Sequence, residues 1–132
     1  GYAIARIGCF GAGCCYGAPT DLPWGALFPG HERAVHPTQL YATLMNLLIF
    51  AGLSYWASRR QFEGQLFAAF LVLHGLYRFI NEFFRAGATS LLALGIFTYG
   101  HLVAAVLMGI GFALYAVLKR RANTHAMLQQ RP

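Results

Sequence analysis

The most constraining feature of the sequence is a set of three long apolar stretches that carry few charges, at residues 37–57, 64–85 and 99–118. A helix needs about 20 apolar residues to cross the hydrocarbon layer of a membrane. The chain is 58% hydrophobic and only 11% charged, whereas soluble domains carry about 25% charged residues. The pattern therefore predicts an all-α fold, a polytopic transmembrane helical bundle with three full spans. It argues against a soluble enzyme and excludes a disordered chain.

The first 36 residues are of a different kind. Residues 1–17 are too short to span a membrane, and they contain Arg6 and five glycines, so we expect a partial helix that runs into an irregular loop. Residues 18–36 are rich in turn-forming residues. Because the chain starts abruptly within an apolar stretch, we expect residues 1–132 to be a single membrane domain, the C-terminal portion of a longer protein.

The basic residues are distributed unevenly about the three spans. Six of them lie in the connection after the first span and in the C-terminal tail, whereas Arg33 and Arg85 lie on the opposite side. The positive-inside rule then predicts a cytoplasmic C terminus and an external connection at 18–36. No basic helix face or nucleic-acid motif accompanies the net charge of +6, so we predict no nucleic-acid partner.

The second span carries a polar stripe at its C-terminal end, formed by His74, Arg78, Asn81, Glu82 and Arg85. At helical spacing these residues share one face, within a sector of about 100°. A charge in mid-bilayer costs at least about 2.5–3.5 kcal/mol, so the stripe should face a polar cavity. Arg78 and Glu82 are spaced to form an ion pair. The alternative is a helix end whose long side chains reach the membrane surface.

A second candidate is the segment His36-Pro37-Thr38-Gln39-Leu40-Tyr41, at the start of the first span. His36, Gln39 and Tyr41 offer an imidazole, an amide and a phenol, which can bind a lipid headgroup or move a proton. Helix capping and hydrogen bonds between helices explain the same residues equally well.

A third candidate is Arg6 with the glycine-rich run that follows it. Arginine and closely approaching backbone N–H groups both bind phosphate. The run contains Cys9, Cys14 and Cys15, whose spacing lacks the CxxC pairs of a zinc site. We therefore predict no metal, and we interpret at least two of these cysteines as small buried hydrophobes. The three candidates together indicate a cavity rich in Arg and His, and a membrane phospholipid is its most economical anionic ligand.

The third span shows Ala105, Gly109 and Ala113 at intervals of four residues. This spacing predicts close packing against another helix. His101 precedes them by one turn and is interpreted as a packing histidine or a residue that lines the cavity.

Several of these segments resemble motifs of the bacterial prolipoprotein diacylglyceryl transferase family. Residues 6–10 with Tyr16-Gly17 resemble its signature segment, and residues 36–41 resemble its His-Pro-Ser/Thr-Gln-Leu-Tyr motif. Residues 77–85 resemble its Arg-Phe and Glu-Phe-x-Arg helix, and residues 98–101 stand where the family often has a Gly-Gln pair. Their order and spacing agree along nearly the whole chain.

The resemblance implies a seven-span enzyme of the bacterial inner membrane with a cytoplasmic C terminus. It implies transfer of a diacylglyceryl group from phosphatidylglycerol to the lipobox cysteine in the signal peptide of a lipoprotein precursor, without a cofactor. It assigns catalytic roles to Arg6, Arg78 and His36. Substrate-binding roles fall to Gly17, Gln39, Tyr41, His74, Asn81, Glu82, Arg85 and His101.

The chain departs from the family pattern at three places. Cys9 and Cys14 stand where the signature has Asn and Glu, and Ala42 stands where the His-Pro motif usually ends in Glu. These losses motivate an alternative function, that of a non-catalytic phospholipid-binding relative. Polar faces on two spans also allow a small transporter or channel component, although they specify no ion.

Overall fold

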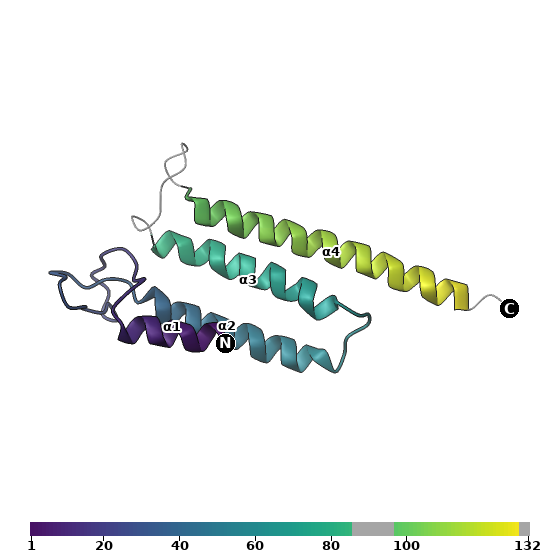
Figure 1. The fold of residues 1–132 in the computed structure, drawn as a ribbon, viewed down its shortest axis with the longest axis horizontal. Coiled ribbons are helices and arrows are strands. Elements are labelled where there is room, and N and C mark those ends of the chain that lie inside the picture. Colours follow the sequence, from purple (N-terminus) through teal and green to yellow (C-terminus); the bar gives the residue numbers. More distant parts are fainter. Residues whose placement is uncertain (86–96, 130–132) are drawn as a thin grey trace.

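The structure is a computed structural model that describes residues 1–85 and 97–129. Within these residues, four helices follow one another: α1 (Tyr2–Gly11), α2 (Thr38–Ala57), α3 (Gln65–Phe84) and α4 (Tyr99–Gln129). Figure 1 shows them lying side by side, with α1 beside α2 and α3 between α2 and α4. Three of them, α2, α3 and α4, are long and apolar enough to cross a membrane. The predicted all-α fold with three spans and a partial N-terminal helix is therefore confirmed.

The ends of α2 and α3 follow the sequence-based prediction closely. Pro37 stands immediately before α2, and Gly64 precedes α3 in the left-handed backbone conformation, with φ of 81°. A side chain at that φ would be strained, so glycine suits the position. The sequence also predicts a short apolar connection at residues 89–97, and all of it except Phe97 lies outside the described residues.

The C-terminal part of α4 differs from the prediction. The helix was expected to end at Leu118, yet it continues through the basic cluster to Gln129. The residues beyond Leu118 are mostly polar, but many of them are good helix formers. Neither Gly nor Pro occurs between Leu118 and the end of α4. Loss of hydropathy marks the end of a membrane span without ending the helix.

The helices α3 and α4 pack closely at two glycines. A Cβ atom added at Gly75 would lie 2.9 Å from the Ala104 carbonyl oxygen, and one added at Gly111 would lie 3.0 Å from that of Ala68. The predicted contact of Ala105, Gly109 and Ala113 with another helix is not made among the described residues, where all three lie on an exposed face of α4. Residues four apart do share one face of α4, as expected. The helix packs against α3 through the neighbouring face, which contains Gly111.

The connection at 12–37 gathers at one end of the bundle, beside the C-terminal ends of α1 and α3 and the N-terminal ends of α2 and α4 (Figure 1). The Ala18 N–H donates to the Phe84 carbonyl at 2.9 Å, which joins the loop to the last turn of α3. Phe28 and Val35 are buried within the loop. This end of the molecule holds most of the candidate site residues.

Candidate functional site

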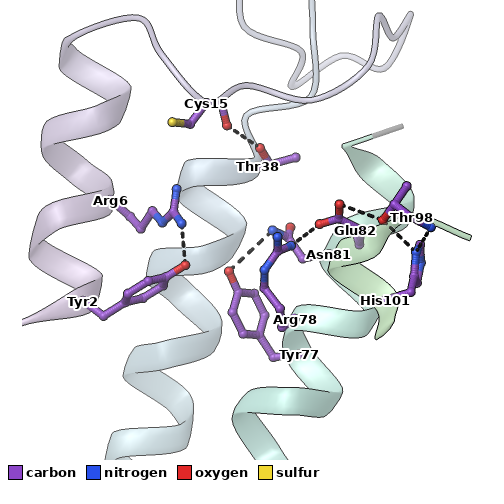
Figure 2. A network of polar contacts seen from close by, with 10 residues as sticks. All are labelled: Tyr2, Arg6, Cys15, Thr38, Tyr77, Arg78, Asn81, Glu82, Thr98 and His101. Carbon is purple, nitrogen blue, oxygen red and sulfur yellow. Dashed lines mark hydrogen bonds and ion pairs between the residues drawn. The ribbon is translucent and has the colours of Figure 1, made fainter. Parts of the chain in front are cut away.

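A polar layer lies between α1 and α3 (Figure 2). The Arg6 guanidinium donates a hydrogen bond to the Tyr2 hydroxyl at 2.6 Å. The Tyr2 ring packs edge-on against the ring of His74, with centroids 5.5 Å apart, and its hydroxyl interacts with that of Tyr77. Arg6 and Arg78 each act electrostatically on His74 and Tyr77, so the two cations face the same polar layer from different helices.

A second chain of contacts joins Arg78 to the start of α4. Arg78 forms the predicted ion pair with Glu82, whose side chain is fully buried. Glu82 also accepts a hydrogen bond from the Thr98 hydroxyl at 2.9 Å. The Thr98 backbone N–H donates to Nδ1 of His101 at 3.1 Å, and a side chain at Gly100 would collide with the Glu82 carboxylate. Glu82 therefore fixes the position of Arg78 and holds α3 against α4.

The polar stripe of α3 is shared between two neighbouring helices. His74 makes a 3.1 Å contact between its Nδ1 and Oδ1 of Asn46 on α2, whereas Glu82 faces α4. Between them, Asn81 donates to the Tyr77 hydroxyl at 3.4 Å. Its own Oδ1 is buried and has no hydrogen-bond partner among the described residues. A ligand donor can therefore satisfy this oxygen.

A cavity of about 440 Å³ opens between α2, α3 and the 12–37 loop. Its walls are almost wholly apolar, and they include Leu44, Ile80 and Phe84. This volume lies within the range of about 300–1,000 Å³ that is usual for small-molecule sites. Tyr77 and Asn81 line it as well, so the polar layer and the apolar cavity meet at these two side chains.

One wall of the cavity carries the predicted imidazole and phenol. Nδ1 of His36 lies 3.3 Å from the Tyr41 hydroxyl, which also accepts a hydrogen bond from Nε1 of Trp24 at 2.9 Å. The rings of His36 and Tyr41 both pack edge-on against Phe84. All four side chains line the cavity. The structure thus brings His36 and Tyr41 together with Asn81.

Of the remaining predicted residues, Gln39 and Gly17 hold the 12–37 loop in place. Gln39 is 1% exposed and donates to the Cys14 carbonyl at 2.6 Å. At Gly17 an added Cβ would collide with the Phe84 carbonyl and the His36 side chain. Arg85 follows α3, and its Nε is buried without a partner among the described residues. His101 is buried among Phe79, Phe83 and Phe97, in agreement with a packing role.

The three cysteines do not behave as predicted. Cys14 and Cys15 are exposed and Cys9 is half-buried, so their interpretation as buried hydrophobes is wrong. Their three sulfur atoms lie within 4.8 Å of one another. A hydrogen bond with the Cys15 thiol raises the pKa of Cys14 to about 11, so this thiol is protonated at neutral pH. The spacing in the sequence did not reveal this cluster, because a turn of the backbone creates it.

The comparisons with known proteins decide the family. A model of the family described as prolipoprotein diacylglyceryl transferase matches residues 1–117. The chain belongs to this family. Its curated relatives include phosphatidylglycerol–prolipoprotein diacylglyceryl transferases of Geobacter sulfurreducens and Methylibium petroleiphilum. These are 36% and 40% identical over 124 and 129 residues, 92% of this chain and 48% of each relative. The chain spans about half the length of the curated relatives it matches.

Membership in the prolipoprotein diacylglyceryl transferase family agrees with the spans of the structure, and the chain is a multi-pass membrane protein. The family match includes every predicted site residue from Arg6 to His101. Tyr2, Trp24 and Thr98 also contact residues of the site, although they are not among the predicted site residues. Tyr2 stands four residues before Arg6, which is the spacing of helical neighbours. The contacts of Trp24 and Thr98 depend on tertiary structure and leave no such signal.

Proposed function

We propose that the protein transfers a diacylglyceryl group from phosphatidylglycerol to the lipobox cysteine in the signal peptide of a lipoprotein precursor. The single observation that carries the proposal is the junction of two unlike surfaces at Tyr77 and Asn81. One is a polar layer with Arg6 and Arg78, and the other is an apolar cavity of about 440 Å³. A phospholipid has the same division between an anionic headgroup and apolar chains. The relatives are named phosphatidylglycerol–prolipoprotein diacylglyceryl transferases, and these names contain the same donor and acceptor class.

The two arginines suit the leaving group of this reaction. The acceptor thiolate forms a C–S bond with the carbon of the diacylglyceryl group that carries the phosphate ester. The C–O bond to the phosphate breaks, and glycerol phosphate leaves with the electron pair. Guanidinium groups aimed at the phosphate stabilise the charge that develops there. We assign this role to Arg6 and Arg78, with Glu82 orienting Arg78 through their ion pair.

The acceptor thiol must lose a proton before it attacks. His36 lines the cavity, and Tyr41 contacts one of its two ring nitrogens. An imidazole held in this way can take a proton through its second nitrogen. We therefore assign His36 the role of general base, with Tyr41 positioning its ring. His74 and Asn81 complete the headgroup site, while Gln39, Gly17, Arg85 and His101 support it.

The site is proposed to face the outside of the bacterial inner membrane, with the C terminus in the cytoplasm. The excess of basic residues in the 58–63 connection and after Leu118 supports this orientation. The lipobox of a translocating precursor would then reach the site from the same side.

A second candidate function is phospholipid binding without transfer. It is favoured by Ala42, which is 1% exposed and brings no carboxylate to the start of α2, and by Cys9 and Cys14 in the signature segment. A transfer assay with a lipobox peptide separates the two functions. Phosphatidylglycerol binding without any modified peptide would support the binding function, whereas any transfer to the peptide would refute it.

The decisive experiment is a transfer assay on the protein expressed from its full open reading frame in phosphatidylglycerol vesicles. A lipobox peptide should gain the mass of one diacylglyceryl group. Arg78→Gln is expected to lower the transfer rate about 10²–10³-fold, because one charge-stabilising donor is lost. The matched control is Arg59→Gln, an exposed arginine beside Tyr55 in the opposite connection, which should leave the rate unchanged. Undiminished transfer by an inserted Arg78→Gln protein would contradict the site assignment.

A further inference from the structure

The three cysteine thiols form a cluster that the proposed transfer does not use, because the acceptor peptide supplies the nucleophile. Cys9 lies in the last turn of α1, and Cys14 and Cys15 follow in the loop. Their sulfur atoms all lie within 4.8 Å of one another. The cluster stands at the same end of the bundle as the cavity, because the 12–37 loop contains Cys14 and Cys15 and also lines the cavity with Leu22 and Trp24.

The backbone holds these thiols together. After α1 ends at Gly11, the chain turns back at Gly13, whose φ is +65°, and the Cys14 N–H donates to the Cys9 carbonyl at 3.1 Å. Cys15 also has a positive φ, of 64°, which is uncommon for a residue other than glycine. Such a conformation persists only where the surroundings fix it.

Two buried side chains of α2 fix the loop in this conformation. Gln39 donates to the Cys14 carbonyl at 2.6 Å, and Thr38 donates to the Cys15 carbonyl at 3.0 Å. Thr38 and Gln39 are 2% and 1% exposed, so the anchors themselves have little freedom. The thiols are therefore brought together by a preformed loop and do not need a ligand to gather them.

The spacing of the sulfur atoms matches that of a metal site. With metal–sulfur bonds of about 2.3 Å in a tetrahedral arrangement, thiolates lie about 3.8 Å apart. Small side-chain rotations close the remaining gap, and two of the three thiols are already exposed to an incoming ion.

We propose that Cys9, Cys14 and Cys15 form a binding site for one thiophilic d¹⁰ cation, Zn²⁺ or Cu⁺, held by three sulfur ligands. The donor set carries the choice of ion, since soft sulfur ligands select Cu⁺ and Zn²⁺ over the hard cations that prefer oxygen. Binding releases the protons of the thiols to solvent and involves no redox change. This proposal is independent of the transfer function, because it concerns residues without a part in that chemistry.

The test uses tag-free protein from the full open reading frame, purified in detergent, fully reduced and then freed of reductant without oxygen. Zn²⁺ alone and Cu⁺ alone are added in separate samples, and the metal content is measured after desalting. We expect one ion per chain in at least one sample and loss of all three thiols from reaction with a thiol reagent. Retention of one ion and not the other would identify the cation.

Three single substitutions locate the site: Cys9→Ser, Cys14→Ser and Cys15→Ser. Each substitution removes a direct ligand and should weaken the affinity for the ion at least ~10–100-fold, which is the usual cost of losing only an outer-sphere partner. Competition with a chromophoric chelator measures the affinity. His31→Gln is the matched control, because it removes an imidazole from the same loop and leaves the sulfurs intact. Circular dichroism and elution volume verify that the variants fold. Failure of the reduced protein to retain either ion would overturn the proposal, as would unchanged affinity in the three serine variants.

Discussion

At the scale of single residues, Glu82 has the most consequential environment. It is 1% exposed, pairs with Arg78 and accepts a hydrogen bond from Thr98. An ionised carboxylate is buried at high cost unless it is paired and hydrogen-bonded, and the structure meets both conditions. The same contacts keep the Arg78 guanidinium directed at the polar layer. One residue therefore links the stability of the bundle to the geometry of the site.

The substitution Glu82→Gln tests this link. Glutamine retains the size of the side chain and can accept the Thr98 hydrogen bond, but it leaves Arg78 without a counter-charge. We expect a loss of about 1–3 kcal/mol in stability, less than for a fully buried pair because Arg78 is 22% exposed. The midpoint of thermal unfolding in detergent measures it. Glu63→Gln is the control, since Glu63 is 95% exposed in its pair with Arg60 and should change stability by less than about 0.5 kcal/mol. Equal midpoints for the two variants would contradict the prediction.

At this scale the sequence predicts contacts within a helix and misses those between distant segments. The pairing of Arg78 with Glu82 follows from their separation of four residues. The Thr98 hydrogen bond joins residues sixteen apart and depends on how α3 and α4 pack. The meeting of Cys9 with Cys14 depends on a turn at Gly13, which no spacing rule for metal ligands describes.

At the scale of elements, the contact between α3 and α4 depends on where the glycines lie. Gly75 and Gly111 face backbone atoms of the opposite helix, whereas a Cβ added at Gly109 would have no neighbour within 4 Å among the described residues. Small residues allow helix backbones to approach each other in a membrane. The sequence predicts that α4 packs through small residues, but it cannot choose among its glycines and alanines, because several of its faces are apolar.

The substitutions Gly111→Ala and Gly109→Ala separate these two positions. A Cβ at Gly111 would lie 2.7 Å from Cγ2 of Val72 and 3.0 Å from the Ala68 carbonyl, so the helices must move apart. We expect Gly111→Ala to destabilise the protein by about 1–3 kcal/mol. Gly109→Ala should be neutral or stabilising by up to about 1 kcal/mol, from helix propensity. Thermal unfolding monitored by size-exclusion chromatography compares the two. A larger loss at Gly109 would show that α4 uses the originally predicted face.

At the scale of the whole molecule, one end of the bundle collects the functional features. The 12–37 loop meets α2 and α3 there and completes the cavity wall with Leu22 and Trp24. Sequence hydropathy predicts the spans because membrane crossing depends on length and polarity alone. Hydropathy does not predict the cavity, because Trp24 and Phe84 come to line the same cavity only after the loop has folded back. In the proposed function, the cavity and the two arginines together form the site for an amphipathic ligand.

The last prediction concerns the apolar half of that ligand. Leu44 lines the cavity, and Leu48 lies one turn further along α2 and does not line it. Leu44→Trp should fill part of the cavity and weaken phosphatidylglycerol binding about tenfold, which corresponds to about 1.4 kcal/mol of lost contact. Leu48→Trp adds the same side chain to the same helix and should leave binding unchanged. Displacement of a fluorescent phosphatidylglycerol from the detergent-solubilised protein measures both affinities. Because Arg6 and Arg78 remain in each variant, equal weakening by both substitutions would show that the acyl chains occupy another surface.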